Sequence, residues 1–338
     1  MAADAAAPDD RRPFDALLFL SFGGPERVED IRPFLENVTR GRGVPPDRLD
    51  DVAEHYVHFG GSPLNGLNRE MIDALRAELD RRGRDLPIYF GNRNWNPLID
   101  EAVDGLLADG HRRALVFATS AWGGYSGCKQ YHEDIARAVE HAGEPDLLLR
   151  RLPQFSTEPG FLDASARAVR AGLERFDGAD PVRVVFTAHS IPIAADERVG
   201  DRLYSRQVAA AAAATAERLG LGDFDLVWQS RSGPPQVPWL EPDIGDHLRD
   251  LAAAGVQRVL VAPIGFISDH IEVVWDLDEE ARELAAELGL DYVRAATVGT
   301  DPGFIAMIAD LVERYADGGG ELTAPGVGDN GNSCGDGC

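Results

Sequence analysis

Acidic side chains are concentrated near the end of the segment GFISDHIEVVWDLDEE (265–280). Residues 272–280 contain five acids, whereas 57 acids spread over 338 residues would place one or two in a stretch of this length. Glu272, Asp276 and Glu279 are four and three residues apart, which puts them on one face of a helix. Such a face can conduct cations or protons, and the alternative is the solvated surface of an acidic protein.

A histidine stands at the end of an apolar run in TAHSIP (187–192). The ordinary pKa of histidine is close to neutrality, which suits a proton acceptor, and a neutral imidazole also binds metals. A lone histidine there is often structural, but ligands of parallel sheets bind beyond the carboxyl ends of the strands. We therefore expect His189 and Glu272, each just after a strand, to share one site. Asp276, Glu279 and Glu280 would lead away from it.

Short apolar runs bounded by Gly, Pro or charge predict two sets of strands. Amphipathic helical patterns alternate with them, for example at 28–38, 71–82, 98–110, 161–176 and 244–255. This alternation predicts an α/β protein with two Rossmann-like, doubly wound lobes whose parallel sheets face one cleft. The predicted strands are 16–21, 86–90 and 114–120 in the first set, and 182–188, 224–230, 258–266 and 290–296 in the second.

The chain divides into five predicted segments. They are a disordered leader (1–13), a first lobe (14–150), a second lobe (151–300), a helix packing back on the first lobe (301–317) and a flexible Gly-rich tail (318–338) that carries two cysteines. The N-terminal residues lack the apolar core of a secretory signal. No run of 18 apolar residues is present, so we expect no integral membrane segment. With three cysteines in all, a cytoplasmic protein is predicted.

Charge and motifs narrow the class of ligand. The formal net charge of −24 disfavours nucleic acid and anionic membranes as partners and favours cations. The turn SFGGPE (21–26) lacks the spacing of a dinucleotide fingerprint, and no Walker A sequence is present. Loops at 56–65, 91–99 and 229–240, with YSRQ at 204–207, supply Tyr, Trp, Ser and Arg. Together they suit a large flat aromatic ligand that carries carboxylates.

Six segments, in this order, resemble the ferrochelatase family: LLFLSFGGPERVEDIRPFL, GGSPLN, GNRNWNP, AHSIP, WQSRSGPPQVPWLEP and FISDHIEVVWDLD. The resemblance runs from Ala16 to about Phe304. It implies that His189 is the metal-facing histidine and Glu272 its partner, both catalytic and both metal ligands. It further implies an acidic row for metal or protons and two contacts to porphyrin propionates. The row is Asp276, Glu279 and Glu280, and the contacts are Ser62 and Tyr131.

YSGCKQYHED, the acidic composition and the C-terminal cysteine pair resemble the actinobacterial branch of the family. That branch implies coproporphyrin III as substrate and a [2Fe–2S] cluster. The cysteines available to such a cluster are Cys128, Cys334 and Cys338, one fewer than four-cysteine ligation needs. The fourth ligand could be an oxygen or nitrogen donor, or the cluster could be absent. Phe22 departs from relatives that place a metal-touching tyrosine before the GGP turn.

The activity implied by the resemblance is insertion of Fe²⁺ into coproporphyrin III with release of two protons. Three alternatives remain open at this point: a protoporphyrin IX ferrochelatase, a cobalt or nickel chelatase of a related tetrapyrrole, and a non-catalytic haem carrier on the same fold. The predicted partners are a porphyrin and ferrous iron. Whether His189 is primarily base or metal ligand is left open by the sequence.

Overall fold

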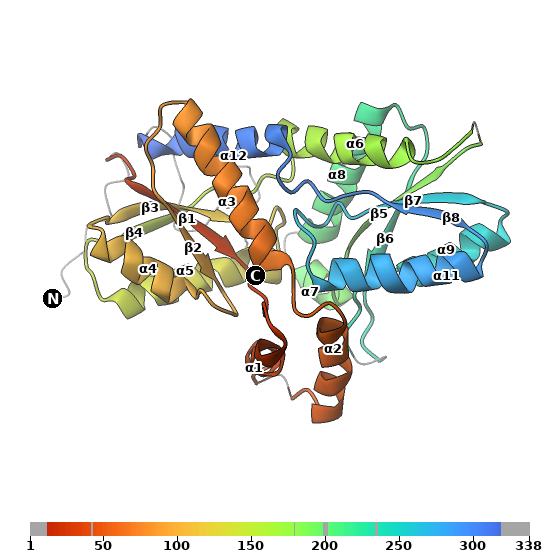
Figure 1. The fold of residues 1–338 in the computed structure, drawn as a ribbon, viewed down its shortest axis with the longest axis horizontal. Helices are drawn as coiled ribbons and strands as arrows, with labels where there is room; N and C mark the ends of the chain where they lie inside the picture. Colours follow the sequence, from red (N-terminus) through yellow and green to blue (C-terminus); the bar gives the residue numbers. More distant parts are fainter. Residues whose placement is uncertain (1–11, 42, 179, 199–201, 234–235, 319–338) are drawn as a thin grey trace.

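Two four-stranded parallel sheets form the framework of the protein (Figure 1). The computed structural model describes residues 12–41, 43–178, 180–198, 202–233 and 236–318. The predicted α/β class with two parallel sheets is confirmed. The first sheet has the order β2-β1-β3-β4 and the second the order β6-β5-β7-β8. Their bounds are β1 Ala16–Ser21, β2 Ile88–Asn92, β3 Arg113–Ala118, β4 Leu148–Arg151, β5 Arg183–His189, β6 Asp225–Gln229, β7 Arg258–Ala262 and β8 Asp291–Arg294.

Helices connect the strands and cover the sheets. The α-helices are α1 Val28–Val38, α2 Pro46–His58, α3 Leu64–Arg81, α4 Ile99–Ala108, α5 Gln130–Ala142, α6 Pro159–Leu173, α7 Ile193–Arg198, α8 Leu203–Leu219, α9 Ile244–Ala253, α10 Ile271–Val273, α11 Ala281–Glu287 and α12 Pro302–Ala316. Two π-helices, η1 Tyr125–Lys129 and η2 Val274–Glu280, carry candidate functional residues. A π-helix is rare and is enriched at functional sites.

The β1 strand is apolar from Ala16 to Leu20 because both of its faces are covered. Successive side chains of a strand point to opposite faces. Leu18 and Leu20 belong to the hydrophobic cluster that includes α4 and α5 residues, whereas Leu17 and Phe19 belong to the cluster that includes α3 and α12 residues. Because neither face of the strand meets water, apolar residues need not alternate with polar ones, and all six residues of β1 are buried.

One large hydrophobic cluster joins the two sheets. It contains Phe117 of β3, Phe186 of β5 and Phe304 of α12. The α12 helix contacts α3, α6 and β3, and the amide of Phe14 donates to the carbonyl of Ala316 at 2.7 Å. The division at residue 150 stays a prediction, because the lobes share this cluster. Most of the predicted leader and tail lie outside the described residues.

Several element boundaries differ from the sequence prediction. The β7 strand ends at Ala262 rather than near Phe266, because Pro263 has no amide hydrogen for the ladder. The helix predicted to start at Met71 starts at Leu64. The YSRQ segment, which the sequence analysis interpreted as a loop, lies in α8.

The α1–α2 pair follows β1 and lies below the junction between the two halves of the molecule in Figure 1. Its apolar side chains form a separate cluster in which Phe34 and Tyr56 pack with Ile271 of α10. The link between α2 and the 271–280 segment therefore connects the two halves beside the candidate site. Among the described residues, no helix has the length and apolarity needed to cross a bilayer.

Candidate functional site

His189 and Glu272 lie together, as the sequence predicts. His189 is the last residue of β5, and Glu272 follows the loop after β7, the neighbouring strand in the sheet. The Nε2 atom of His189 lies 3.4 Å from the Glu272 Oε2 atom, and both side chains are partly exposed. The Nδ1 atom of His189 contacts the Ser190 carbonyl, which can only accept a hydrogen bond. The Nδ1 atom therefore carries a proton that it donates to this carbonyl, and the Nε2 atom faces Glu272.

The two groups favour each other's charged forms. Burial disfavours a charged imidazole, but the Glu272 carboxylate and the Ser190 carbonyl outweigh it and raise the pKa of His189 above its ordinary value. Burial would likewise raise the pKa of Glu272, but the imidazolium of His189 outweighs it and lowers that pKa. Near neutrality the pair is therefore an imidazolium–carboxylate pair. A divalent cation that binds Glu272 would offset the carboxylate charge, so the imidazolium of His189 would lose its proton more readily.

A second histidine, His270, adjoins the pair and was not identified from the sequence. Its Nδ1 atom accepts a hydrogen bond from the Glu272 amide at 3.1 Å and lies 3.9 Å from the Glu272 Oε2 atom. This histidine is the N-cap residue of α10. Burial lowers the pKa of His270, in keeping with an unprotonated Nδ1 that accepts. The only signal was its position in SDHIE, two residues before Glu272.

The predicted acidic row lies on the η2 π-helix rather than on an α-helix. The wider π turn means that the four-and-three spacing no longer defines a common face. Asp276 accepts from Gln229 and Ser230, whereas Glu279 lies 3.8 Å from His58 of α2. Glu280 accepts from the indole of Trp275 at 2.9 Å. The row therefore extends from the end of β6 toward α2.

Asp276 is held by two residues that the sequence analysis did not assign. The Gln229 amide donates to Asp276 at 3.3 Å and to the Glu272 carbonyl at 3.1 Å. Ser230 donates to the same carboxylate oxygen from a backbone with φ of 62°, a region that non-glycine residues seldom adopt. Burial, with the Glu272 charge adding to it, raises the pKa of Asp276 to about 7. Asp276 can therefore take up and release a proton near neutrality.

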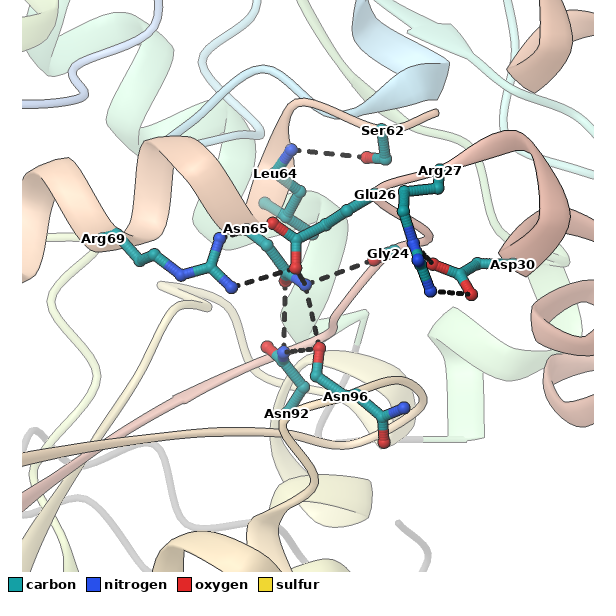
Figure 2. Close-up of polar contacts among 10 residues, drawn as sticks. All are labelled: Gly24, Glu26, Arg27, Asp30, Ser62, Leu64, Asn65, Arg69, Asn92 and Asn96. Carbon is teal, nitrogen blue, oxygen red and sulfur yellow. Dashed lines mark hydrogen bonds and ion pairs between the residues drawn. The ribbon is translucent and has the colours of Figure 1, made fainter. Parts of the chain in front are cut away.

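On the first-sheet side, Ser62 belongs to a packed group of three segments, which Figure 2 shows. They are the SFGGPE turn, the start of α3 with the residues just before it, and the segment from Asn92 to Asn96. Asn65 is fully buried, and its amide nitrogen donates to the carbonyls of Gly24 at 3.2 Å and Asn96 at 3.0 Å. Asn92 donates to the Asn65 oxygen at 3.1 Å. A Cβ atom at Gly24 would lie 2.8 Å from the Ser62 Cβ, so glycine allows this close approach.

Figure 2 also shows an ion pair that closes this group. Arg69 of α3 binds Glu26 through two contacts, one of them 2.9 Å long. Glu26 accepts from Asn65 as well, at 3.4 Å. The SFGGPE turn is therefore fixed to α3 by side chains. Ser62 itself is 9% exposed, and its hydroxyl accepts from the Leu64 amide at 3.4 Å.

Tyr131 lies at the start of α5, with its ring beside two guanidinium groups. Arg93 lies 4.6 Å and Arg151 5.5 Å from the ring centroid, and the residue is 4% exposed. Arg93 also lies 5.9 Å from the ring of Phe22, which is 41% exposed. Arg93 is paired with Asp134 at 2.6 Å, so Arg151 is the guanidinium that can give the Tyr131 neighbourhood a positive character suited to a carboxylate.

Cys128, in the η1 π-helix, is the one cysteine among the described residues and is a predicted cluster ligand. Its sulfur lies 3.0 Å from an Arg151 nitrogen and 3.5 Å from the Nε2 atom of His132. Cys334 and Cys338 lie outside the described residues. The structure therefore places one sulfur and one imidazole nitrogen side by side.

The chain is similar to known proteins in sequence and in fold. The ferrochelatase family model matches residues 14–316. A coproporphyrin III ferrochelatase of Nocardia farcinica is 58% identical over 312 residues, covering 90% of this chain and 89% of the relative. One of Mycobacteroides abscessus is 56% identical over 315 residues, covering 93% and 92%. The cobalt complex of the sirohydrochlorin chelatase SirB from Bacillus subtilis subspecies spizizenii superposes with a TM-score of 0.54 at 11% identity, over 90% of this chain and 96% of that one. This last likeness concerns the fold alone.

Proposed function

Because the chain belongs to the ferrochelatase family, we propose that it inserts ferrous iron into coproporphyrin III and releases two protons. The observation that carries the proposal is the pairing of the His189 Nε2 atom with the Glu272 carboxylate at 3.4 Å. A pair of this kind offers a nitrogen and an oxygen donor to iron and a route for protons. The choice of coproporphyrin III rests on the two relatives of 58% and 56% identity.

The reaction exchanges two pyrrole protons for one Fe²⁺ ion. Iron approaching Glu272 competes with the imidazolium for the carboxylate, which lets His189 lose its proton. This proton passes to the nearby acids, and neutral His189 then accepts the two pyrrole protons one after the other and passes each of them along the same route. Asp276, whose pKa lies at about 7, can accept each proton and release it toward solvent. Glu279 and Glu280 continue this row and are proposed to conduct protons or iron.

Ser62 and Tyr131 are proposed to bind porphyrin propionates. Ser62 is fixed to the SFGGPE turn by its amide, which donates to the Pro25 carbonyl at 2.7 Å, and the ring of Tyr131 lies beside Arg93 and Arg151. Contacts remote from the pyrrole nitrogens would offset the strain of bending the macrocycle, which exposes the nitrogen lone pairs. Carboxylate recognition on this side would leave the reacting nitrogens to face His189.

Replacing His189 by alanine tests the proposal. Iron insertion into coproporphyrin III should be lost, while the porphyrin still binds, because the proton acceptor is removed and the propionate contacts remain. The matched control is His247→Ala, since His247 also pairs with a carboxylate, Asp225 at 2.9 Å, away from the site. This control should retain its turnover. A His189→Ala enzyme with near-normal kcat would show that His189 is structural.

Substrate choice is tested with the same assay. Coproporphyrin III should be metalated faster than protoporphyrin IX, and Fe²⁺ should be inserted in preference to Co²⁺ or Ni²⁺. A faster reaction with protoporphyrin IX, or with either other metal, would reassign the substrate. Binding of porphyrin without any turnover would instead indicate a carrier.

We also propose a [2Fe–2S] cluster ligated by Cys128, Cys334, Cys338 and one nitrogen donor. The structure supports part of this set, because the Nε2 atom of His132 lies 3.5 Å from the Cys128 sulfur. A chain with three cysteines needs a ligand of another type, and histidine replaces cysteine in some cluster proteins. His132 is therefore the candidate fourth ligand.

Anaerobic purification with iron and sulfide analysis tests the cluster. Iron and sulfide should be present in equal amounts, and His132→Ala should shift the visible absorption or lose the cluster. His141→Ala, in the last turn of the same helix, is the control and should leave the spectrum unchanged. Colourless protein after reconstitution with iron and sulfide would rule the cluster out.

A cytoplasmic location is proposed as well. The odd number of cysteines supports it, since free thiols persist in a reducing compartment. Fractionation of the source cells, with activity followed in each fraction, is the direct test. Recovery of the activity mainly outside the cytoplasm would contradict the proposal.

A further inference from the structure

One guanidinium group holds both ends of the segment that carries the candidate site. Arg294 is the last residue of β8. Its Nη1 and Nη2 atoms each donate to Asp269 at 3.1 Å. Its Nε and Nη2 atoms donate to Asp278 at 2.7 and 2.6 Å. Asp269 lies immediately before His270, and Asp278 lies in the η2 π-helix, so Glu272 and Asp276 lie between the two anchors.

The same strand makes a second contact to the π-helix. Tyr292, two residues before Arg294, donates from its hydroxyl to the Leu277 carbonyl at 2.9 Å. Residues two apart on a strand point to the same face. The β8 strand therefore supports the π-helix through adjacent side chains, one bound to its backbone and one to the Asp278 carboxylate.

The segment needs such an anchor for two reasons. A π-helix is less favourable than an α-helix and persists where tertiary contacts hold it. In addition, the η2 helix carries four acids, which repel one another: Asp276, Asp278, Glu279 and Glu280. The Arg294 side chain is 15% exposed and contacts two carboxylates at once, so its charge is poorly screened by water.

We propose that Arg294 is a positioning residue for the reaction, which holds the Glu272 carboxylate within reach of His189 by fixing Asp269 and Asp278. The proposal rests on the proposed function for its kinetic consequence but not for its structural one. Loss of the guanidinium releases both ends of the 269–278 segment. Glu272 and Asp276 then move relative to the end of β5, while the porphyrin contacts on the first sheet stay in place.

The test compares Arg294→Gln and Arg294→Lys with a matched control. Lysine keeps the charge and favours folding, but its ammonium cannot make both bidentate contacts. The control is Arg258→Gln at the start of β7. Its side chain is 18% exposed and lies 3.5 and 3.7 Å from two carboxylates, Asp180 and Asp291. This control loses a comparable buried cation at the opposite end of the strands.

For Arg294→Gln we expect kcat to fall roughly 10- to 100-fold, as for other supports of metal-binding side chains. The Kd for coproporphyrin III should stay within about twofold of wild type, and Arg258→Gln should keep its kcat within about twofold. Arg294→Lys should lie between Arg294→Gln and wild type. Equal kcat losses in the Arg294→Gln and Arg258→Gln variants would assign the effect to stability and overturn the proposal.

A second readout does not depend on turnover. Trp275 lies in the η2 helix and stacks on His55 of α2, with ring centroids 3.8 Å apart. Its fluorescence, obtained by difference from a Trp275→Phe background, should change in both Arg294 variants and not in Arg258→Gln. Unchanged Trp275 fluorescence in folded Arg294→Lys would refute the positioning role. Wild-type protein that fails to metalate coproporphyrin III would refute the proposed function instead and leave this readout valid.

Discussion

Replacing Asp276 by asparagine should change how the stability of the protein depends on pH. Burial raises the pKa of Asp276 to about 7 from an ordinary 3.8. Between these values the unfolded chain has already released the proton that the folded protein keeps. The folded state binds more protons, so its stability falls as the pH rises. The contribution of protonated Asp276 is complete below pH 3.8 and is lost as the pH rises through about 7.

The size of the effect follows from the same pKa. Each pH unit over which only the folded state binds the proton removes about 1.36 kcal/mol of stability. From pH 5 to the folded pKa of about 7 this amounts to about 2.7 kcal/mol, and little more is lost above it. Asparagine cannot ionise, yet its carbonyl oxygen can accept the hydrogen bonds of Gln229 and Ser230. The Asp276→Asn variant therefore does not lose this part of its stability as the pH rises.

Urea unfolding at pH 5 and pH 8 measures the difference. The free energy of unfolding of Asp276→Asn minus that of wild type should be about 2.7 kcal/mol larger at pH 8 than at pH 5. Other titrating groups are shared by the two proteins and cancel to first order. Asp73→Asn, at an α3 position whose side chain is 74% exposed, is the control and should follow wild type. Parallel pH dependence in wild type and Asp276→Asn would refute the reasoning.

Two further substitutions test the packing. Gly160→Ala should cost roughly 1–3 kcal/mol of stability, because an added Cβ would lie 2.5 Å from the Met307 Cβ on α12. An unchanged Tm would contradict this. Asn65→Asp should cost about 1–3 kcal/mol, because a carboxylate cannot donate to the Gly24 and Asn96 carbonyls, which accept from the asparagine. An unaltered midpoint of unfolding in guanidinium chloride would show that the Asn65 amide contributes little to stability.

Local sequence pattern predicts what local physics determines. The β1 and β5 strands could be predicted because each contains consecutive apolar residues, 16–20 in β1 and 184–186 in β5. The β4 strand was missed because its sequence LLRR contains two arginines, which are nevertheless 6% and 5% exposed. An arginine inside a sheet is stable only with partners that come from elsewhere in the chain, such as the Ser120 and Gly127 carbonyls for Arg151.

The site shows the same division. The proximity of His189 and Glu272 could be predicted, because the chain segments that carry them leave neighbouring parallel strands at a common edge. The π-helical form of 274–280 could not, because acids with four-and-three spacing favour an α-helix when considered alone. The hydrogen bonds from Arg294 to Asp269 and Asp278 could not be predicted either. Arg294 lies 16 residues from Asp278 and 25 from Asp269, and no local spacing connects residues so far apart.

The return of α12 to the first sheet has a consequence for folding during synthesis. The α12 residues Met307 and Ile308 share one cluster with Met71 and Leu75 of α3. The α12 helix, which covers α3, is therefore synthesised after the strands of both sheets. A nascent chain that stops before residue 302 would expose Met71 and Leu75, the kind of apolar surface that chaperones bind. Closure of the first hydrophobic core should therefore wait until α12 has been made.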